Sequence, residues 1–267
     1  MPLTKFHPLV ESWFRGRFAA PTDVQVRSWP EIRSGRDILI SAPTGSGKTL
    51  AAFLTCIDSL FAQSVEGTLE DRTAVLYVSP LKALSNDVQK NLEAPLAELR
   101  ALDPSLPDVR VLVRTGDTPA KDRQAMVKKH PHVLVTTPES LYILLTSDGG
   151  RALLRGVRTV IIDEIHALAR DKRGSHFALS MERLKALLPA PPQLIGLSAT
   201  TKPLERLARF LSGAPREGRA PVEVVQVGHV RPWELTIETP EDELSAVATH
   251  EMWGQLYDRL VALSKEH

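Results

Sequence analysis

The sequence contains a single cysteine, Cys56, among its 267 residues. One thiol cannot form an internal disulfide, and the chain has no cysteine cluster of the kind that binds zinc. The first residues lack the apolar run of a signal peptide, and no stretch approaches ~18 uninterrupted apolar residues. We therefore expect a protein of the reducing cytoplasm with no membrane partner.

The chain also lacks an excess of charge of either sign. Its 33 lysines and arginines face 32 aspartates and glutamates, which gives a net charge of +1. This excludes a globally basic nucleic-acid-binding protein, but a local basic surface stays open, because steering depends on where the charges lie. The length is sufficient for a sizeable core and predicts one or two domains at ~150 residues each.

Short apolar runs alternate with longer amphipathic stretches as far as residue 227. The apolar runs are mostly β-branched and predict strands at 38–40, 74–78, 109–113, 133–135, 160–162, 194–197 and 222–225. The amphipathic stretches predict helices at roughly 48–63, 83–101, 119–130, 138–146, 175–188 and 203–212. Such alternation requires crossover connections, so we expect an α/β fold with a mainly parallel sheet and helices on both faces.

This alternation stops after residue 227. A strand-like stretch at 234–238 is followed by a last amphipathic segment at about 241–265, with no further element for that segment to connect to. The sequence therefore predicts one domain over 1–230 and a severed piece of a second over 231–267.

Residues 42–49 read Ala-Pro-Thr-Gly-Ser-Gly-Lys-Thr, between an expected strand and an expected helix. Glycines there let successive backbone N–H groups point at phosphate oxygens, and the helix N-terminus adds partial positive charge. Lys48 is predicted to reach the β- and γ-phosphates, and the Thr49 hydroxyl to bind Mg²⁺. The residues expected around the phosphates are Pro43, Thr44, Gly45, Ser46, Gly47, Lys48 and Thr49.

Asp163 and Glu164 directly follow the expected strand at 160–162. They should lie where ligands of open α/β sheets bind, outside the carboxyl ends of the strands. Asp163 is a candidate Mg²⁺ ligand, and Glu164 a candidate to orient or deprotonate an attacking water. An acidic pair alone is more often a loop feature or a helix cap, and the phosphate loop is what favours the catalytic interpretation.

Ser198 and Thr200 follow the strand at 194–197, and their hydroxyls are candidates for hydrogen bonds to the acidic segment. Alone, they fit a helix cap equally well. His166 alone would more often be a structural histidine, and no second histidine or cysteine stands at a spacing that would make a zinc site.

In this order, residues 42–49, 163–166 and 198–200 resemble motifs I, II and III of DEAD/DEAH-type helicases of superfamily 2. The resemblance implies an N-terminal RecA-like domain, a three-layer P-loop NTPase sandwich that binds ATP and Mg²⁺. It assigns catalytic and coupling roles to Lys48, Asp163, Glu164, His166, Ser198 and Thr200.

Three further segments are similar to the same family. Residues 18–25 resemble the Q motif, in which the glutamine, here Gln25, reads the adenine edge. Segments 79–84 and 137–140 resemble motifs Ia and Ib, which grip the nucleic-acid backbone. The nucleic-acid contacts that the resemblance implies are Pro80, Lys82, Arg114, Thr115, Gly116, Thr137 and Ser140.

The residues of these motifs and of the segments around them most resemble the Lhr (large helicase-related) group, over nearly the whole chain from about residue 8. This implies an ATP-driven monomeric translocase that moves 3′ to 5′ on single-stranded DNA, unwinds duplexes, and has a role in DNA repair. The family's second RecA-like domain, with its arginine finger, and its later domains are absent from the 267 residues, so we expect little turnover from this chain alone.

Other functions remain open at this point. An RNA helicase or an enzyme that unwinds RNA:DNA hybrids shares this first domain, and the chain alone would serve as a nucleotide- and nucleic-acid-binding module. A phosphate-loop kinase leaves the motif Ia and Ib segments unexplained. We interpret Cys56 as a core residue, and Trp13, Phe14 and Phe18 as core residues with stacking on adenine as the alternative. The basic group Lys121, Arg123, Lys128 and Lys129 is interpreted as a solvated helix face.

Overall fold

The computed structural model describes residues 2–80, 89–104, 108–170, 172–213, 220–228 and 249–266. The chain divides into two compact units, 1–228 and 229–267, and each is described by itself.

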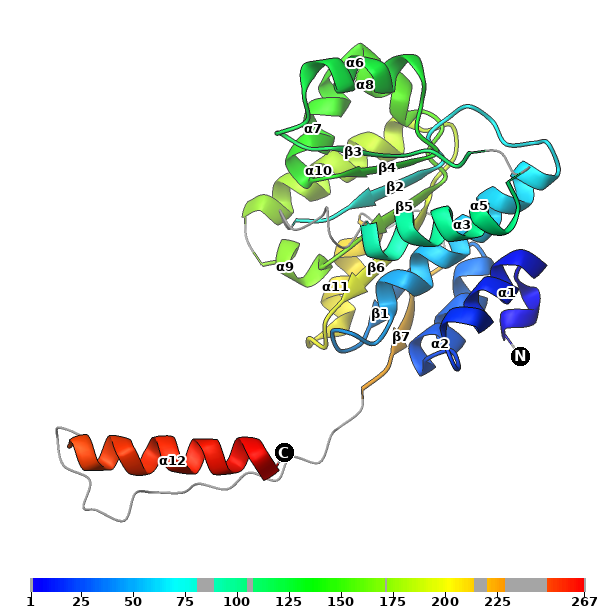
Figure 1. Ribbon diagram of the computed structural model, residues 1–267. Helices are drawn as coiled ribbons and strands as arrows, with labels where there is room; N and C mark the ends of the chain where they lie inside the picture. The colour runs from blue at the N-terminus through cyan, green and yellow to red at the C-terminus, as the bar shows by residue number, and fades with distance from the viewer. Residues whose placement is uncertain are drawn as a thin grey trace. The chain divides into compact units, whose positions relative to one another are not determined.

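One seven-stranded sheet forms the centre of the first unit (Figure 1). Its strands are β1 (Ile38–Ser41), β2 (Val75–Val78), β3 (Val111–Arg114), β4 (Val133–Thr136), β5 (Thr159–Ile162), β6 (Gln193–Ser198) and β7 (Glu223–Gln226). Their spatial order is β3-β4-β2-β5-β6-β1-β7, and every neighbouring pair runs parallel. All seven predicted strands are confirmed, and the mainly parallel sheet is parallel throughout the described part.

Twelve helical segments are described in this unit. They are η1 (Pro2–Lys5), α1 (Pro8–Arg17), α2 (Asp23–Arg33), α3 (Lys48–Val65), η2 (Gln89–Glu93), α5 (Ala94–Leu102), α6 (Ala120–Lys128), α7 (Pro138–Thr146), α8 (Asp148–Leu154), α9 (Ile165–Leu168), α10 (Lys172–Leu187) and α11 (Leu204–Ser212). Five predicted helices appear as α3, α6, α7, α10 and α11, and the described part of the sixth appears as η2 and α5.

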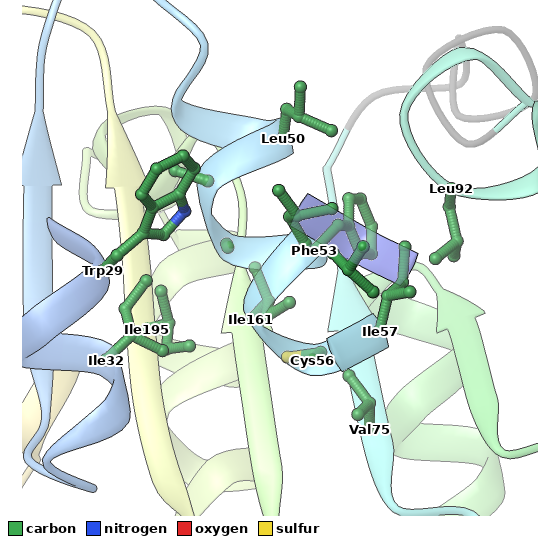
Figure 2. Close-up of a cluster of buried hydrophobic side chains, with 14 of the residues drawn as sticks. Trp29, Ile32, Leu50, Phe53, Cys56, Ile57, Val75, Leu92, Ile161 and Ile195 are labelled. Carbon is green, nitrogen blue, oxygen red and sulfur yellow. The ribbon is translucent and has the colours of Figure 1, made fainter. Parts of the chain in front are cut away.

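Helices α1, α2, α3 and α5 cover one face of the sheet and share one apolar cluster with it. Figure 2 shows this cluster where Phe53 and Ile57 of α3 pack against the sheet beside Trp29 of α2. Cys56 lies in the same cluster, where burial raises the pKa of its thiol to about 12. Its predicted place in the core is confirmed by its burial.

The opposite face of the sheet packs against α7 to α11 in a second apolar cluster. Strand side chains alternate between the faces: Leu76 and Val78 of β2 belong to this cluster, and Val75 and Tyr77 to the first. Strands buried on both faces explain why the sequence shows unbroken apolar runs. Two helical layers around one sheet confirm the predicted three-layer sandwich.

The two first helices are fixed to the phosphate-loop helix by a charged cluster around Asp58 of α3. One Asp58 carboxylate oxygen accepts from the backbone N–H of His7 at 2.6 Å, and the other is 2.6 Å from the Arg33 guanidinium of α2. That guanidinium also lies 4.1 Å from the centre of the Phe6 ring. A buried carboxylate with both oxygens paired holds α1 and α2 in register with α3.

His132, next to β4, predicts how the stability of this unit depends on pH. Its Nδ1 accepts from the backbone N–H of Arg110 at 3.0 Å. Burial lowers the pKa of His132 from 6.5 to about 4, and the positive charges of Arg110 and Lys129 act in the same direction. The negative charge of Asp108 opposes this shift. Between these values the unfolded chain binds more protons than the folded one, so the free energy of unfolding falls as the pH falls.

We expect this single group to remove up to about 3 kcal/mol of stability between pH 6.5 and pH 4. A His132→Asn variant keeps an acceptor near the Nδ1 position but does not titrate. Urea unfolding of both proteins at the two pH values measures the difference: the wild type should lose more stability than the variant. Equal losses would show that His132 is not responsible.

The second unit contains one described helix, α12 (His250–Glu266), which overlaps most of the amphipathic segment predicted at 241–265. Its rings Trp253 and Tyr257 stack with their centres 5.8 Å apart. The strand-like stretch predicted at 234–238 lies outside the described residues. Across both units, none of the described helices combines the length and the apolar character that crossing a membrane requires.

Candidate nucleotide and nucleic-acid sites

Parallel strands bring their carboxyl ends to one edge of the sheet, here called the carboxyl edge. The central strands β5, β6 and β1 are neighbours there, although more than 120 positions separate Ser41 from Asp163 in the chain. In this register Ser41 pairs with Ser198, and Ile162 with Gly196. The phosphate loop, the acidic pair and the Ser-Ala-Thr segment therefore leave the sheet side by side.

The phosphate loop turns sharply into α3 at two glycines with left-handed backbone. Gly45 has a φ of 79° and Gly47 a φ of 88°, and Gly47 is the N-cap of α3. A Cβ on Gly47 would lie 2.8 Å from Nε2 of Gln25 and 3.4 Å from Oγ1 of Thr22. The left-handed backbone favours glycine at this position, and a larger residue would also have to displace the Gln25 amide from its capping position.

The ammonium group of Lys48 lies inside the phosphate loop. Its Nζ donates to the carbonyl oxygens of Ala42 at 2.6 Å and Pro43 at 2.8 Å, and the residue is only 7% exposed. Burial lowers the pKa of this amine, although the carboxylates of Glu164 and Asp163 act in the opposite direction. The ammonium group therefore lies desolvated between loop carbonyls and the acidic pair, where phosphate oxygens would compete for it.

Gln25 lies directly against the phosphate loop. Helix α2 begins with a capping box in which Oε1 of Gln25 accepts from the Thr22 backbone N–H at 3.0 Å. The Thr22 hydroxyl in turn donates to the carbonyl oxygen of Ser46 at 2.9 Å. The side chain of Gln25 is buried and joins α2 to the loop, while its contact with adenine stays a prediction.

Asp163 is buried, and each of its carboxylate oxygens accepts a hydrogen bond from the protein. Oδ1 accepts from the backbone N–H of Glu164 at 2.8 Å, and Oδ2 accepts from the hydroxyl of Tyr77 on β2. Glu164 has a left-handed backbone with a φ of 47°, a conformation that costs non-glycine residues energy. At this turn the Asp163 carboxylate is buried against Tyr77, while the Glu164 carboxylate lies beside His166 and stays partly exposed.

His166 connects the acidic pair to β6. Its Nε2 lies 3.2 Å from Oε2 of Glu164, and its Nδ1 lies 3.3 Å from Oγ of Ser198 and 3.4 Å from the backbone nitrogen of Ala199. Since a backbone N–H can only donate, Nδ1 accepts and Nε2 carries the proton that faces Glu164. Thr200 is exposed, and the hydroxyl that bonds to Ser198 is that of Thr201, at 3.1 Å.

The strands β3, β4 and β2 present a second group of residues at the carboxyl edge. Arg114 ends β3 and is 6% exposed, and its guanidinium donates to the carbonyl oxygen of Thr115 at 2.5 Å. Burial and then the charge of Arg123 lower the pKa of Arg114. Arg123 donates to the carbonyl oxygens of Thr118 at 2.7 Å and Gly116 at 2.6 Å. Two guanidiniums thus flank the loop at 115–118.

The remaining predicted contacts differ in exposure. Thr137 is the N-cap of α7, where its hydroxyl accepts from the Ser140 backbone N–H at 3.3 Å, and the Ser140 side chain is buried. Pro80 follows β2 and is half-buried, while Lys82 lies outside the described residues. Of these residues, Thr137 and Pro80 are accessible at the edge, and Ser140 contributes to the helix start.

Residues 22–207 match the DEAD/DEAH box helicase family. The chain belongs to this family. It is 46% identical to the Lhr helicase/probable uracil glycosylase of Mycolicibacterium smegmatis over 100% of this chain and 17% of the relative. It is 45% identical to the ATP-dependent helicase Lhr-Core protein 2 of Thermococcus barophilus, over 97% of this chain and 30% of the relative.

A solved structure of the helicase Lhr of Mycobacterium smegmatis bound to ssDNA and AMP-PNP is also similar to this helicase chain. It superposes with a TM-score of 0.80 at 46% identity, over 100% of this chain and 33% of that one. The predicted family, its Lhr likeness and the RecA-like fold are confirmed. The chain spans less than a third of the length of the two curated relatives.

For this DEAD/DEAH box helicase chain, sequence reasoning missed two side chains at the carboxyl edge. Arg123 was grouped with a solvated helix face, which is where Lys121, Lys128 and Lys129 do lie, exposed on α6 and after it. The five-residue spacing from Thr118 gave no signal that Arg123 reaches back to that loop. Tyr77 was counted only as part of an apolar run. The aromatic residues Trp13 and Phe14 belong to the core as predicted, and Phe18 is partly buried and packs against it.

Proposed function

We propose that this chain is the ATP-binding motor domain of an ATP-dependent DNA helicase. The observation that carries the proposal is the meeting of the phosphate loop, the acidic pair and Ser198 at three neighbouring strand ends. ATP phosphates would take the place of the loop carbonyls at Lys48, and Glu164 would orient or deprotonate the attacking water. His166 and Ser198 would transmit the nucleotide state to the nucleic-acid side.

Magnesium is proposed to bind beside the phosphates through the Thr49 hydroxyl and the Asp163 carboxylate. Both groups coordinate through oxygen, the ligand atom that Mg²⁺ prefers, and the Asp163 carboxylate is held by the Glu164 N–H and the Tyr77 hydroxyl. When bound, the ion would neutralise charge on the phosphates. The Asp163 carboxylate is already oriented for that role by the protein.

Nucleic acid is proposed to cross the ends of β2, β3 and β4, where Arg114 and Arg123 supply positive charge and Thr137 a hydroxyl. Contacts to backbone phosphates are largely independent of base sequence, as a translocase requires. The relative solved with ssDNA favours single-stranded DNA as the ligand. RNA or an RNA:DNA hybrid is the alternative, since phosphate contacts alone do not distinguish them.

An Arg123→Gln variant tests this surface. We expect about 10-fold weaker binding of single-stranded DNA, because one charge-assisted contact is lost, and a salt slope smaller by ~0.7. Fluorescence anisotropy at several salt concentrations measures both. Lys128→Gln on the exposed face of the same helix is the matched control and should bind as the wild type does. Equal behaviour of the two variants would place the DNA elsewhere.

Residues 231–267 are proposed to be the interdomain linker and the start of a second RecA-like domain in a longer, monomeric, cytoplasmic protein. The likeness to Lhr helicases favours 3′-to-5′ movement and a role in DNA repair, both of which stay predictions. Steady-state ATP hydrolysis by the 267-residue chain tests the competing view that it is a binding module alone. We expect nucleotide binding with little turnover, and robust DNA-stimulated turnover would refute the view that this chain alone is an inactive binding module.

A further inference from the structure

Tyr77 is a polar side chain in the apolar strand β2. All four residues of β2 are buried, and Tyr77 is 1% exposed. A buried hydroxyl without a partner costs about 1–3 kcal/mol, so the partner of the Tyr77 hydroxyl matters for the fold and for the site. The hydroxyl donates to Oδ2 of Asp163, the carboxylate proposed to bind Mg²⁺.

The register of the sheet explains how this bond forms. Tyr77 pairs with Ile161 of β5, and Asp163 lies two residues further along the same chain direction. Side chains two residues apart share a face, and a tyrosine is long enough to reach its diagonal neighbour. The bond therefore links two strands at the point where β5 becomes the acidic turn.

The ring of Tyr77 is also held from the helical layer. Phe53 of α3 lies with its ring centre 4.8 Å from that of Tyr77, at an interplanar angle of 35°. Figure 2 shows Phe53 on the side of α3 that faces the sheet. Since α3 begins at Lys48 and Thr49, one chain of contacts runs from the phosphate-loop helix through Phe53 and Tyr77 to Asp163.

We propose that Tyr77 is a positioning residue for the magnesium site. Its hydroxyl fixes the rotation of the Asp163 carboxylate, whose other oxygen is held by the Glu164 N–H, so the acid meets Mg²⁺–nucleotide in one orientation. Phe53 aligns this arrangement with the helix that bears Lys48 and Thr49. The inference rests on the proposed role of Asp163 as a magnesium ligand.

Loss of a hydrogen bond that orients a metal ligand lowers metal affinity by about 10–100-fold. In Tyr77→Phe, the ring keeps its packing on Phe53, but Oδ2 of Asp163 loses the hydrogen bond from the tyrosine hydroxyl. We expect nucleotide affinity in EDTA to stay as in the wild type. The factor by which Mg²⁺ increases that affinity should fall about 10-fold or more.

Titration of a fluorescent ATP analogue with Mg²⁺ or with EDTA measures this factor without any need for turnover. Tyr142→Phe is the matched control, because Tyr142 on α7 is exposed and its ring contacts His176, with the ring centres 4.6 Å apart. Phe53→Leu keeps the hydroxyl and loosens the packing, so it should reduce the factor less. In an Asp163→Ala background, removal of the Tyr77 hydroxyl should have no further effect if Tyr77 acts through that carboxylate.

The outcomes separate the two proposals. A wild type that binds no nucleotide, or binds it without any response to Mg²⁺, contradicts the proposed function. A wild type with a normal magnesium response and a Tyr77→Phe variant with the same response overturns the role of Tyr77 alone. The role of Tyr77 is also overturned if removal of its hydroxyl reduces the Mg²⁺ effect as much in the Asp163→Ala background as in the wild type. The hydroxyl would then act on the fold and not on the carboxylate.

A second measurement uses the unsubstituted sequence in case Tyr77→Phe does not fold. The chain has three tyrosines, so 3-fluorotyrosine labelling gives three ¹⁹F signals, which Tyr142→Phe and Tyr257→Phe assign by elimination. Adding Mg²⁺ to the nucleotide-bound protein should shift the Tyr77 signal and leave the other two in place. A Tyr77 signal that does not respond to Mg²⁺ would overturn the inference.

Discussion

Lys48→Met is expected to weaken nucleotide binding by about 100-fold and to abolish ATP-dependent unwinding by the intact protein. The ammonium group is the positive charge inside the phosphate loop, and a charged hydrogen bond to phosphate contributes about 1.5–3 kcal/mol. Methionine fits the same buried path without the charge. Nucleotide titration of the 267-residue chain and an unwinding assay on the intact protein measure the two effects.

The same variant should fold normally, because two effects on stability oppose each other. Burial lowers the pKa of Lys48, so below that pKa the folded state bears the cost of a desolvated charge, which methionine removes. The carbonyl oxygens of Ala42 and Pro43 lose their donor in return. We expect the free energy of unfolding to change by no more than about 1–2 kcal/mol.

Lys185→Met is the matched control for a buried lysine. Its Nζ is bonded to Glu182 and to the carbonyl oxygen of Ser212, at 2.8 Å and 2.7 Å, on the opposite side of the sheet from α3. The control should lose stability, because it leaves Glu182 without its partner, and should bind nucleotide with the wild-type affinity. Nucleotide binding that survives in Lys48→Met would contradict the assignment of the phosphate loop.

The strands and most of the candidate site were predictable from the sequence for a physical reason. Strands buried on both faces need continuous apolar runs, and ligand groups in such folds follow those runs directly, as Asp163 follows β5. The helices α1 and α2 were not predicted from the sequence, and their segments contain Pro8 and Pro30. Pro8 occupies the first turn, where its missing N–H is tolerated, and Pro30 lies near the end of α2.

Contacts between segments distant in sequence were beyond prediction. Tyr77 reaches Asp163 because β2 lies beside β5 in the sheet. The hydrophobic pattern of a single strand does not reveal which strands will be its neighbours. Arg123 was similarly read as part of a solvated face, since only the turn at 115–118 brings it back toward Arg114. Thr201 in place of Thr200 beside Ser198 depends on the backbone path after β6.

Glu164→Gln is the variant that separates nucleotide binding from its hydrolysis. Glutamine keeps the length of the side chain and an oxygen acceptor for the Nε2–H of His166, which lies 3.2 Å away. It also meets the same left-handed backbone at this position, so the strain of the turn is unchanged. What it removes is the carboxylate that would accept a proton from water.

We therefore expect the intact protein with Glu164→Gln to bind ATP as tightly as the wild type and to hydrolyse it about 10²–10⁴-fold more slowly. Steady-state hydrolysis with saturating single-stranded DNA, beside nucleotide titration, measures both. Glu223→Gln changes a carboxylate of β7 that is paired with Arg36 and lies away from the carboxyl edge, and it should leave both values unchanged. A Glu164→Gln enzyme that retains turnover would show that the Glu164 carboxylate does not activate the water. The general base would then have to be another group at the carboxyl edge.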